Sequence, residues 1–287
     1  MDRRSLLKFF GSSALVGVMP SATSGLALEN THRVSEMEGQ FKTGMDSVDD
    51  YIGRIGPGDV LAIAGHVLSG RTSFALTIAN HFCRFHGKDV IYWGPHIDQD
   101  AMLATAIQTF SLERVGTLHL RCTHNALGDV SSINLGLLIV DNFEKYLASH
   151  DSNWNMKPKL IEEKLGELQL FAAQNHCLVM PLLTIPRDDD FLRDPPFSVW
   201  PGIWDLGYLG WAIEKIAKTA VLWRPTHCSP YYGGSFEKCT AFTMPRQRLR
   251  LSNEGMMKLL LMNEETGLFL DISEEEALSC SGRYFCV

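Results

Sequence analysis

At residues 65–72 the chain reads Gly65-His66-Val67-Leu68-Ser69-Gly70-Arg71-Thr72. Glycines near both ends of this segment let backbone N–H groups approach phosphate oxygens, because no side chain stands in the way. The pattern is that of a phosphate-binding loop with one substitution, since Arg71 occupies the place of the usual lysine. Arginine keeps the positive charge, but its longer, forked group has a different geometry.

We therefore expect a nucleotide site at this loop, with ATP and Mg²⁺ as its ligands. The loop residues that we expect to surround the phosphates are Gly65, Gly70, Arg71, Thr72 and Ser73. The hydroxyl group of Thr72 is also expected to ligate Mg²⁺.

The flanks of the loop predict the order strand, loop, helix that such a site needs. An apolar run at 60–64 precedes the loop, and residues 73–86 have helical periodicity. The side chains of this helix that we expect to point inward are Phe74, Ile78, Phe82 and Phe85.

Apolar segments and amphipathic segments alternate along the rest of the chain, which predicts a mostly parallel, twisted sheet with helices on both faces. The other strands of this sheet are expected at 90–93, 118–120, 137–140, 178–183 and 219–223, and further helices at 98–110 and 157–175. Three tail segments, 241–244, 258–262 and 268–270, predict antiparallel strands that extend one edge of the sheet.

The apolar run at 137–140 ends in Asp141. A buried strand that ends in aspartate puts a carboxylate at the carboxyl edge of a parallel sheet, beside the phosphate loop. We therefore predict that Asp141 holds Mg²⁺ together with Thr72.

The amino terminus predicts an export signal. Paired arginines, Arg3 and Arg4, precede a weakly hydrophobic segment and small residues near Ala27, as in twin-arginine signals. The predicted organisation is a leader at 1–28, a linker at 29–42, one domain at 43–272 and a tail at 273–287. Two hypotheses stay open for the leader: export to the periplasm by the twin-arginine machinery, or an amphipathic helix on a cytoplasmic protein.

Composition and charge narrow the class of protein. The 287 residues are 45% hydrophobic and 21% charged, as in globular proteins, and the formal net charge is −7. An acidic total argues against a surface for non-specific nucleic-acid binding, although it leaves room for a local basic groove. The seven cysteines contain no C-x-x-C pair, and the spacing of His81 and His86 predicts ordinary histidines that lie on poorly matched faces of their helix.

Over about residues 40–272 the chain resembles the RecA-like ATPase domain of DnaB-type replicative DNA helicases, a P-loop NTPase fold. The segments that carry the resemblance are 43–50, 56–59, the loop, the strand before Asp141, 213–218, 246–248, 255–260 and 266–269. The resemblance implies a head-to-tail homo-oligomer in which Arg248 reaches a neighbour's nucleotide as a catalytic finger, with Arg246 as the adjacent base. It also implies single-stranded DNA as a partner.

Three positions depart from this family. His96 stands in place of the catalytic glutamate, Thr184 in place of the glutamine that senses the terminal phosphate, and Arg71 in place of lysine. Loss of a positioned base slows water attack by about a hundredfold to ten-thousandfold. The loop after residue 187 also contains Asp188, Asp189 and Asp190, where cations would be needed to track DNA.

Two hypotheses for function remain open. The first is a DnaB-like P-loop protein of DNA replication or unwinding that binds ATP, with weak or absent hydrolysis. The alternative is an exported, catalytically inactive RecA-fold protein that serves as a binding or scaffold module. The aromatic segment at 200–211 is interpreted either as a partner-binding patch or as buried loop packing.

Overall fold

The structure is a computed structural model, which describes residues 39–94, 115–122, 127, 130, 133–186, 203–223, 239–243, 258–263 and 266–271. The predicted leader at 1–28 and most of the predicted linker lie outside the described residues, as does the helix expected at 98–110.

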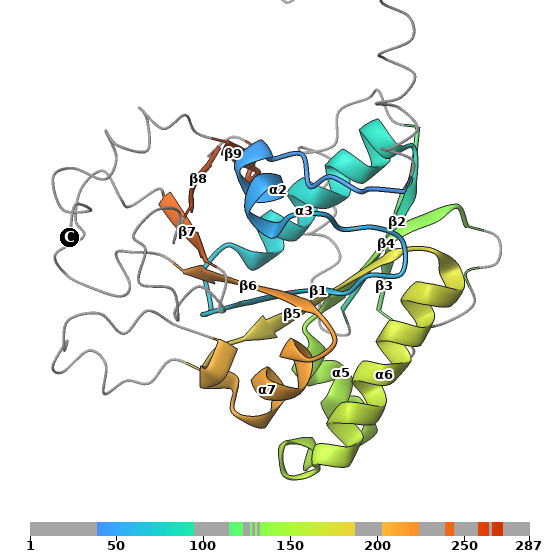
Figure 1. Cartoon of the computed structure of the whole chain (residues 1–287), viewed down its shortest axis with the longest axis vertical. Helices are drawn as coiled ribbons and strands as arrows, with labels where there is room; N and C mark the ends of the chain where they lie inside the picture. The colour runs from blue at the N-terminus through green and yellow to red at the C-terminus, as the bar shows by residue number, and fades with distance from the viewer. Residues whose placement is uncertain are drawn as a thin grey trace, which may run out of the picture. The chain divides into compact units, whose positions relative to one another are not determined.

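The described strands form one nine-stranded sheet in the order β3-β2-β4-β5-β1-β6-β7-β8-β9 (Figure 1). Strands β1 to β6 pair in parallel, and β7, β8 and β9 extend one edge in antiparallel register. The bounds of the strands are β1 Leu61–Gly65, β2 Asp89–Trp93, β3 Leu118–Arg121, β4 Leu135–Asp141, β5 Leu178–Thr184, β6 Lys218–Trp223, β7 Cys239–Thr243, β8 Lys258–Met262 and β9 Phe269–Asp271.

Helices cover both faces of this sheet. Helices α2 (Asp46–Ile52) and α3 (Arg71–His81) lie on one face, and α5 (Phe143–His150), α6 (Pro158–Asn175) and α7 (Tyr208–Glu214) lie on the other (Figure 1). Because side chains alternate along a strand, each strand contributes side chains to the hydrophobic cores on both faces of the sheet. In β1, Leu61 and Ile63 pack on the α3 face, while Ala62 and Ala64 pack on the α6 face.

The predicted fold class is therefore confirmed, and each predicted strand lies within two residues of an observed one. A buried parallel sheet explains the agreement, since strands covered on both faces are continuous apolar runs. Sequence reasoning did not predict the short helices α2, α5 and α7 from periodicity.

Two predictions about the end of the first long helix are wrong. Residues Phe82–His86 form a π-helical turn, whose i to i+5 hydrogen bonds widen the helix. The turn brings the rings of His81 and His86 to 5.2 Å between centroids, although they were expected on unmatched faces. It also leaves Phe85 68% exposed, although Phe74, Ile78 and Phe82 are buried as expected.

The described part of the aromatic segment is helical. A 3-10 turn, η4 (Ile203–Leu206), leads into α7, and Ile203 and Leu209 are buried. The ring of Trp211 is partly exposed and lies under the ammonium group of Lys215, with 3.2 Å between Nζ and the ring centroid. The buried side chains of this segment are therefore aliphatic, and the two interpretations of its aromatic residues both stay open. In the part of the chain that the structure describes, no helix is both long enough and apolar enough to cross a membrane.

Candidate functional site

The glycine-rich loop connects β1 to α3 at the carboxyl edge of the sheet, as predicted. A Cβ atom on Gly65 would lie 2.4 Å from the carbonyl oxygen of Leu222 and 2.5 Å from Oγ of Ser69. Gly70 has a φ of +91°, and a Cβ atom there would lie 2.7 Å from the ring of Phe269. Both positions therefore require glycine. At Gly65 the reason is the close approach of neighbouring atoms, and at Gly70 it is the positive φ together with such a close approach.

The tip of the loop carries two apolar side chains. Val67 is 63% exposed and Leu68 is 73% exposed, and Leu68 has a φ of 66°. A left-handed conformation is costly for a residue with a Cβ atom. By contrast, the base of the loop is anchored, because Thr240 Oγ1 donates to the carbonyl oxygen of the buried Ser69 at 3.3 Å.

Arg71 does not extend freely into solvent. Its Nη1 donates to Oγ1 of Thr184 at 3.0 Å, which is possible because β1 and β5 are neighbours with Gly65 in register with Thr184. Burial lowers the pKa of Arg71, and the carboxylates of Asp141 and Glu144 oppose this effect. The cation of the loop is therefore held at the end of β5.

Thr72 and Asp141 are brought together as the sequence predicts for a metal site. Thr72 Oγ1 donates to Oδ2 of Asp141 at 3.3 Å, and the hydroxyl of the buried Tyr92 donates to the same oxygen at 2.5 Å. Burial, followed by the charge of Asp141, raises the pKa of Tyr92. Because both bonds use Oδ2, the second oxygen of Asp141 is the one best suited to face a cation.

These residues fit Mg²⁺. In the described part of the chain, no group of three or more His, Cys, Asp and Glu side chains is placed to hold a metal ion. Mg²⁺ does not need such a group, since it usually keeps several waters and binds one or two carboxylates together with substrate phosphates. One carboxylate, Asp141, and one hydroxyl, Thr72, match that donor set.

Sequence reasoning missed Asn142 and Glu144, which join the same cluster from the start of α5. Glu144 Oε1 accepts from the backbone N–H of Thr184 at 2.5 Å, and Asn142 Nδ2 donates to Oγ1 of Thr184 at 3.1 Å. Asn142 also caps α5, because its Oδ1 accepts from the N–H of Lys145. Asn142 directly after Asp141, with Glu144 two residues further on, is typical of a helix start and is the available signal.

Glu144 is an unusual member of the cluster. Its Oε2 is buried and has no hydrogen-bond partner among the described residues. Burial raises the pKa of Glu144 to about 7, against the opposing effects of the Glu144 and Thr184 backbone N–H groups and of Arg71. A carboxyl group of this kind changes charge near neutral pH.

Of the other predicted site residues, Ser73 is the one that lies in the described part of the chain. Ser73 lies in the first turn of α3, where its carbonyl oxygen accepts from Oγ1 of Thr77. His96, Arg246 and Arg248 lie outside the described residues, and so does the loop with Asp188, Asp189 and Asp190.

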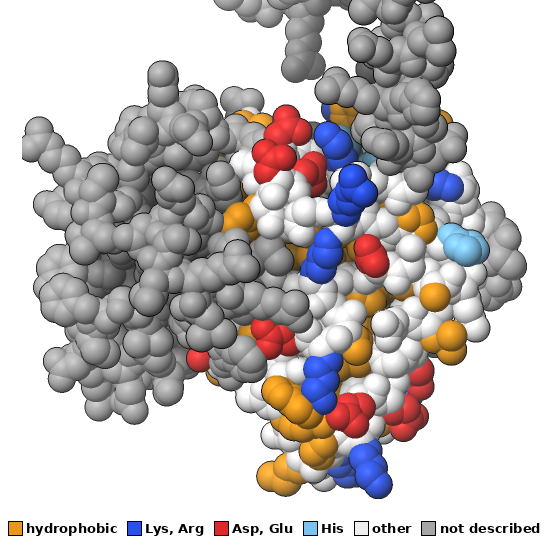
Figure 2. Space-filling view, viewed as in Figure 1, with side chains coloured by type: hydrophobic (Ala, Val, Ile, Leu, Met, Phe, Trp, Pro, Cys, Tyr) orange, Lys and Arg blue, Asp and Glu red, His pale blue; other side chains and the backbone are white. Residues whose placement is uncertain are grey.

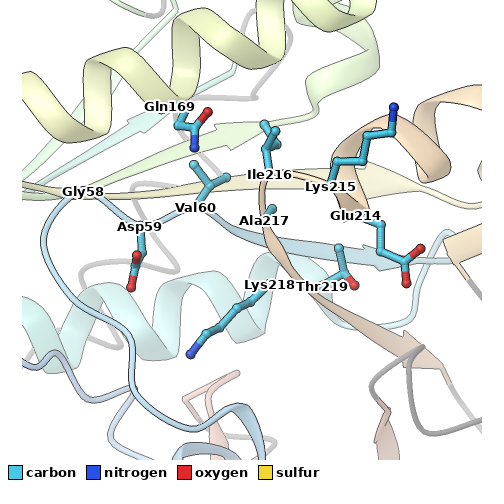
Figure 3. Close-up of a pocket in the computed structure, with 10 residues that line it drawn as sticks. All are labelled: Gly58, Asp59, Val60, Gln169, Glu214, Lys215, Ile216, Ala217, Lys218 and Thr219. Carbon is cyan, nitrogen blue, oxygen red and sulfur yellow. The ribbon is translucent and has the colours of Figure 1, made fainter.

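A separate cavity of about 290 Å³ lies at the opposite, amino-terminal end of β1 and β6 (Figure 3). Several of its polar groups are already engaged. Asp59 accepts from the N–H of Gly56, and Lys218 donates to the carbonyl oxygens of Ile52 and Arg54, at the end of α2 and just after it. The ammonium group of Lys215 lies over the ring of Trp211. None of the residues that line the cavity belongs to the phosphate loop, so the cavity is separate from the nucleotide site.

On the face in Figure 2, acidic and basic side chains of the described residues are interspersed, without a continuous basic stripe.

Comparison with known proteins defines the class of fold. Among the solved structures that resemble this chain is an ATPase domain with a TM-score of 0.63 and 13% identity, over 88% of this chain and 100% of that one. A DnaB-like replicative helicase, solved in a study of its interactions with primase, has a TM-score of 0.61 and 13% identity over 88% and 68% of the two chains. The RadB recombinase has a TM-score of 0.50 and 18% identity over 81% and 99%.

The chain therefore has the RecA-like α/β fold of these ATPase structures. At such low identity the likeness extends to the fold alone. No family model matches the chain, and no curated protein matches it.

Proposed function

We propose that residues 43–272 form a nucleoside triphosphate-binding domain that takes ATP with Mg²⁺ and hydrolyses it weakly or not at all. The observation that carries this proposal is the 3.3 Å contact between Thr72 and Asp141, which adjoins a loop with two obligatory glycines. A hydroxyl and a carboxylate at this place supply ligands for Mg²⁺.

The loop and the start of α3 would hold the phosphates. The first N–H groups of a helix have no partner within it, and together with the helix dipole they favour an anion. In this role Gly65 and Gly70 permit close approach, while Arg71, Thr72 and Ser73 begin the helix. Arg71 adds a positive charge near the terminal phosphates.

Weak hydrolysis is inferred from the residues that would act on water. His96 replaces the glutamate of the family that the chain resembles, and Thr184 replaces its glutamine. The contact between Arg71 and Thr184 adds to this inference, because the cation is already engaged at β5. A site with these substitutions suits binding better than rapid turnover.

The partners belong to the same proposal. A DnaB-like role in DNA replication or unwinding would involve a head-to-tail homo-oligomer, with Arg248 and Arg246 at a neighbour's nucleotide, and single-stranded DNA. The alternative, an exported and inactive scaffold, is supported by the substitutions at Arg71, His96 and Thr184 together with the twin-arginine pattern of the leader.

Thermal unfolding of the full chain with millimolar ATP, with and without Mg²⁺, tests nucleotide binding. A ligand at a hundred times its Kd stabilises a protein by about 2.7 kcal/mol, so a clear rise in Tm is expected. Arg71→Met should remove much of the rise, whereas Arg54→Met, at an exposed arginine away from the loop, should retain it. An unchanged Tm for the wild-type protein at every ATP concentration would contradict the proposal.

A further inference from the structure

We infer that Glu144 is an internal counter-ion of Arg71 and that it competes with nucleotide phosphates for this arginine. The inference rests on the proposed function, since it names a residue that sets the affinity of the same site. It concerns a residue that lies outside the predicted site residues.

Thr184 connects the two charged groups. Its Oγ1 accepts from Nη1 of Arg71 at 3.0 Å, and its backbone N–H donates to Oε1 of Glu144 at 2.5 Å. The guanidinium and the carboxyl group are thereby fixed on one residue at the end of β5. Neither can leave this arrangement without breaking a hydrogen bond.

The hydroxyl of Thr184 has a definite orientation in this cluster. It accepts from Arg71 and also from Nδ2 of Asn142 at 3.1 Å, which occupies both of its lone pairs. The hydroxyl proton must therefore point to a third group. Glu144 and Arg71 are thus held by a residue whose position is fixed from two sides.

The charges around Glu144 single out Arg71 as its partner. Among the described residues, Arg71 is the cation near Glu144, and Asp141 is the neighbouring acid. Tyr92 is tied to Asp141, and His66 lies against the carbonyl oxygen of the adjacent Ile185 at 3.3 Å between Nδ1 and the oxygen. Asp141 already has Thr72 and Tyr92 as donors, whereas Oε2 of Glu144 has no hydrogen-bond donor in the described cluster.

A bound phosphate and the carboxylate of Glu144 therefore compete for the same cation, Arg71. Arg71 favours a charged Glu144 while the site is empty, and a bound triphosphate would attract the same cation toward the loop. Charges attract each other more strongly inside a protein than in water, so the loss of Glu144 as a partner costs Arg71 a favourable interaction. Removing the charge of Glu144 should release Arg71 to the phosphates and tighten nucleotide binding.

The test compares wild-type protein with Glu144→Gln by calorimetric titration with Mg²⁺ and a non-hydrolysable ATP analogue. Glutamine keeps an acceptor oxygen for the N–H of Thr184, so the change removes the charge and leaves this hydrogen bond. At pH 8 the variant should bind about tenfold more tightly, and at pH 6, where wild-type Glu144 is itself neutral, the difference should disappear. Glu163→Gln, at a side chain that is 65% exposed, is the control and should bind as wild type does.

A second measurement needs no nucleotide. A double-mutant cycle of Arg71→Met and Glu144→Gln in the free protein, read by urea unfolding, reports the interaction of the two residues directly. At pH 8, where Glu144 is charged, Arg71→Met should lower the free energy of unfolding more in the wild-type background than in the Glu144→Gln background. At pH 5.5 Arg71→Met should have the same effect in both backgrounds.

The two failures are distinguishable. Equal or weaker binding by Glu144→Gln at pH 8, or a cycle with no interaction, would overturn the counter-ion role. If wild-type protein does not bind the analogue at either pH, the proposed function is overturned. In that case the cycle still decides whether Glu144 and Arg71 act as a pair.

Discussion

Thr72 and Asp141 are separated by 69 residues, and their side-chain oxygens lie 3.3 Å apart. The pair forms because Thr72 begins α3 directly after the loop, while β4 ends at Asp141 on the same edge of the sheet. One hydroxyl and one carboxylate lie at this edge as ligands for a metal ion, so we expect Mg²⁺ to bind there.

Asp141→Asn should remove the Mg²⁺-dependent part of ATP binding. An amide is a poorer ligand for Mg²⁺ than a carboxylate, so the affinity measured with Mg²⁺ should fall to that measured with EDTA. Titration calorimetry under both conditions checks this expectation. Asp50→Asn, at an exposed aspartate of α2, is the control, and a Mg²⁺ effect that survives Asp141→Asn would show that the metal is held elsewhere.

Gly65→Ala should destabilise the domain. The added methyl group would lie 2.4 Å from the carbonyl oxygen of Leu222, which is backbone and cannot move aside cheaply. Overpacking of this kind costs about 1–3 kcal/mol, visible as a lower urea midpoint. Gly166→Ala is the matched control, because α6 has open space there and alanine favours a helix by roughly 1 kcal/mol.

Glu144 should make the stability of the protein depend on pH between about 4.5 and 7. Its pKa is raised by burial to about 7 from 4.5, so over this range the unfolded chain loses the proton while the folded protein keeps it. The folded state therefore loses stability as pH rises, by about 3 kcal/mol in all, and the loss is complete above pH 7.

Urea unfolding of wild-type protein and Glu144→Gln at pH 4.5, 6 and 8 measures this effect. The free energy of unfolding of the variant should exceed that of the wild type at pH 8 and match it near pH 4.5. Equal pH profiles for the two proteins would exclude an elevated pKa at Glu144. Using the difference between the proteins cancels the titration of every other group.

The leader gives a prediction that does not depend on the domain. A reporter fused after Leu28 should be exported by the twin-arginine pathway, because residues 1–28 carry the paired arginines and a weakly hydrophobic segment. Replacing Arg3 and Arg4 by lysine keeps the charge and should stop export. A reporter that stays in the cytoplasm with either leader would refute the export signal and favour a cytoplasmic protein.

The fold could be predicted because its signals are local. Each buried strand is a short apolar run, and the loop at 65–72 has the strand and helix that it needs on either side. Asp141 could be foreseen for the same reason, since the end of a parallel strand is recognisable in the sequence. These features are continuous apolar runs and a helical period of about four residues, which the chain displays directly.

The contacts inside the site were decided by tertiary structure alone. Arg71 reaches Thr184 across 113 residues, and Glu144 reaches the same residue across 40. Neither contact follows from a local pattern, because both require the β4-β5-β1 order of neighbouring strands. The sequence by itself determined a sheet with a phosphate loop at its edge, whereas the strand order and the burial of Glu144 decided which charges meet there.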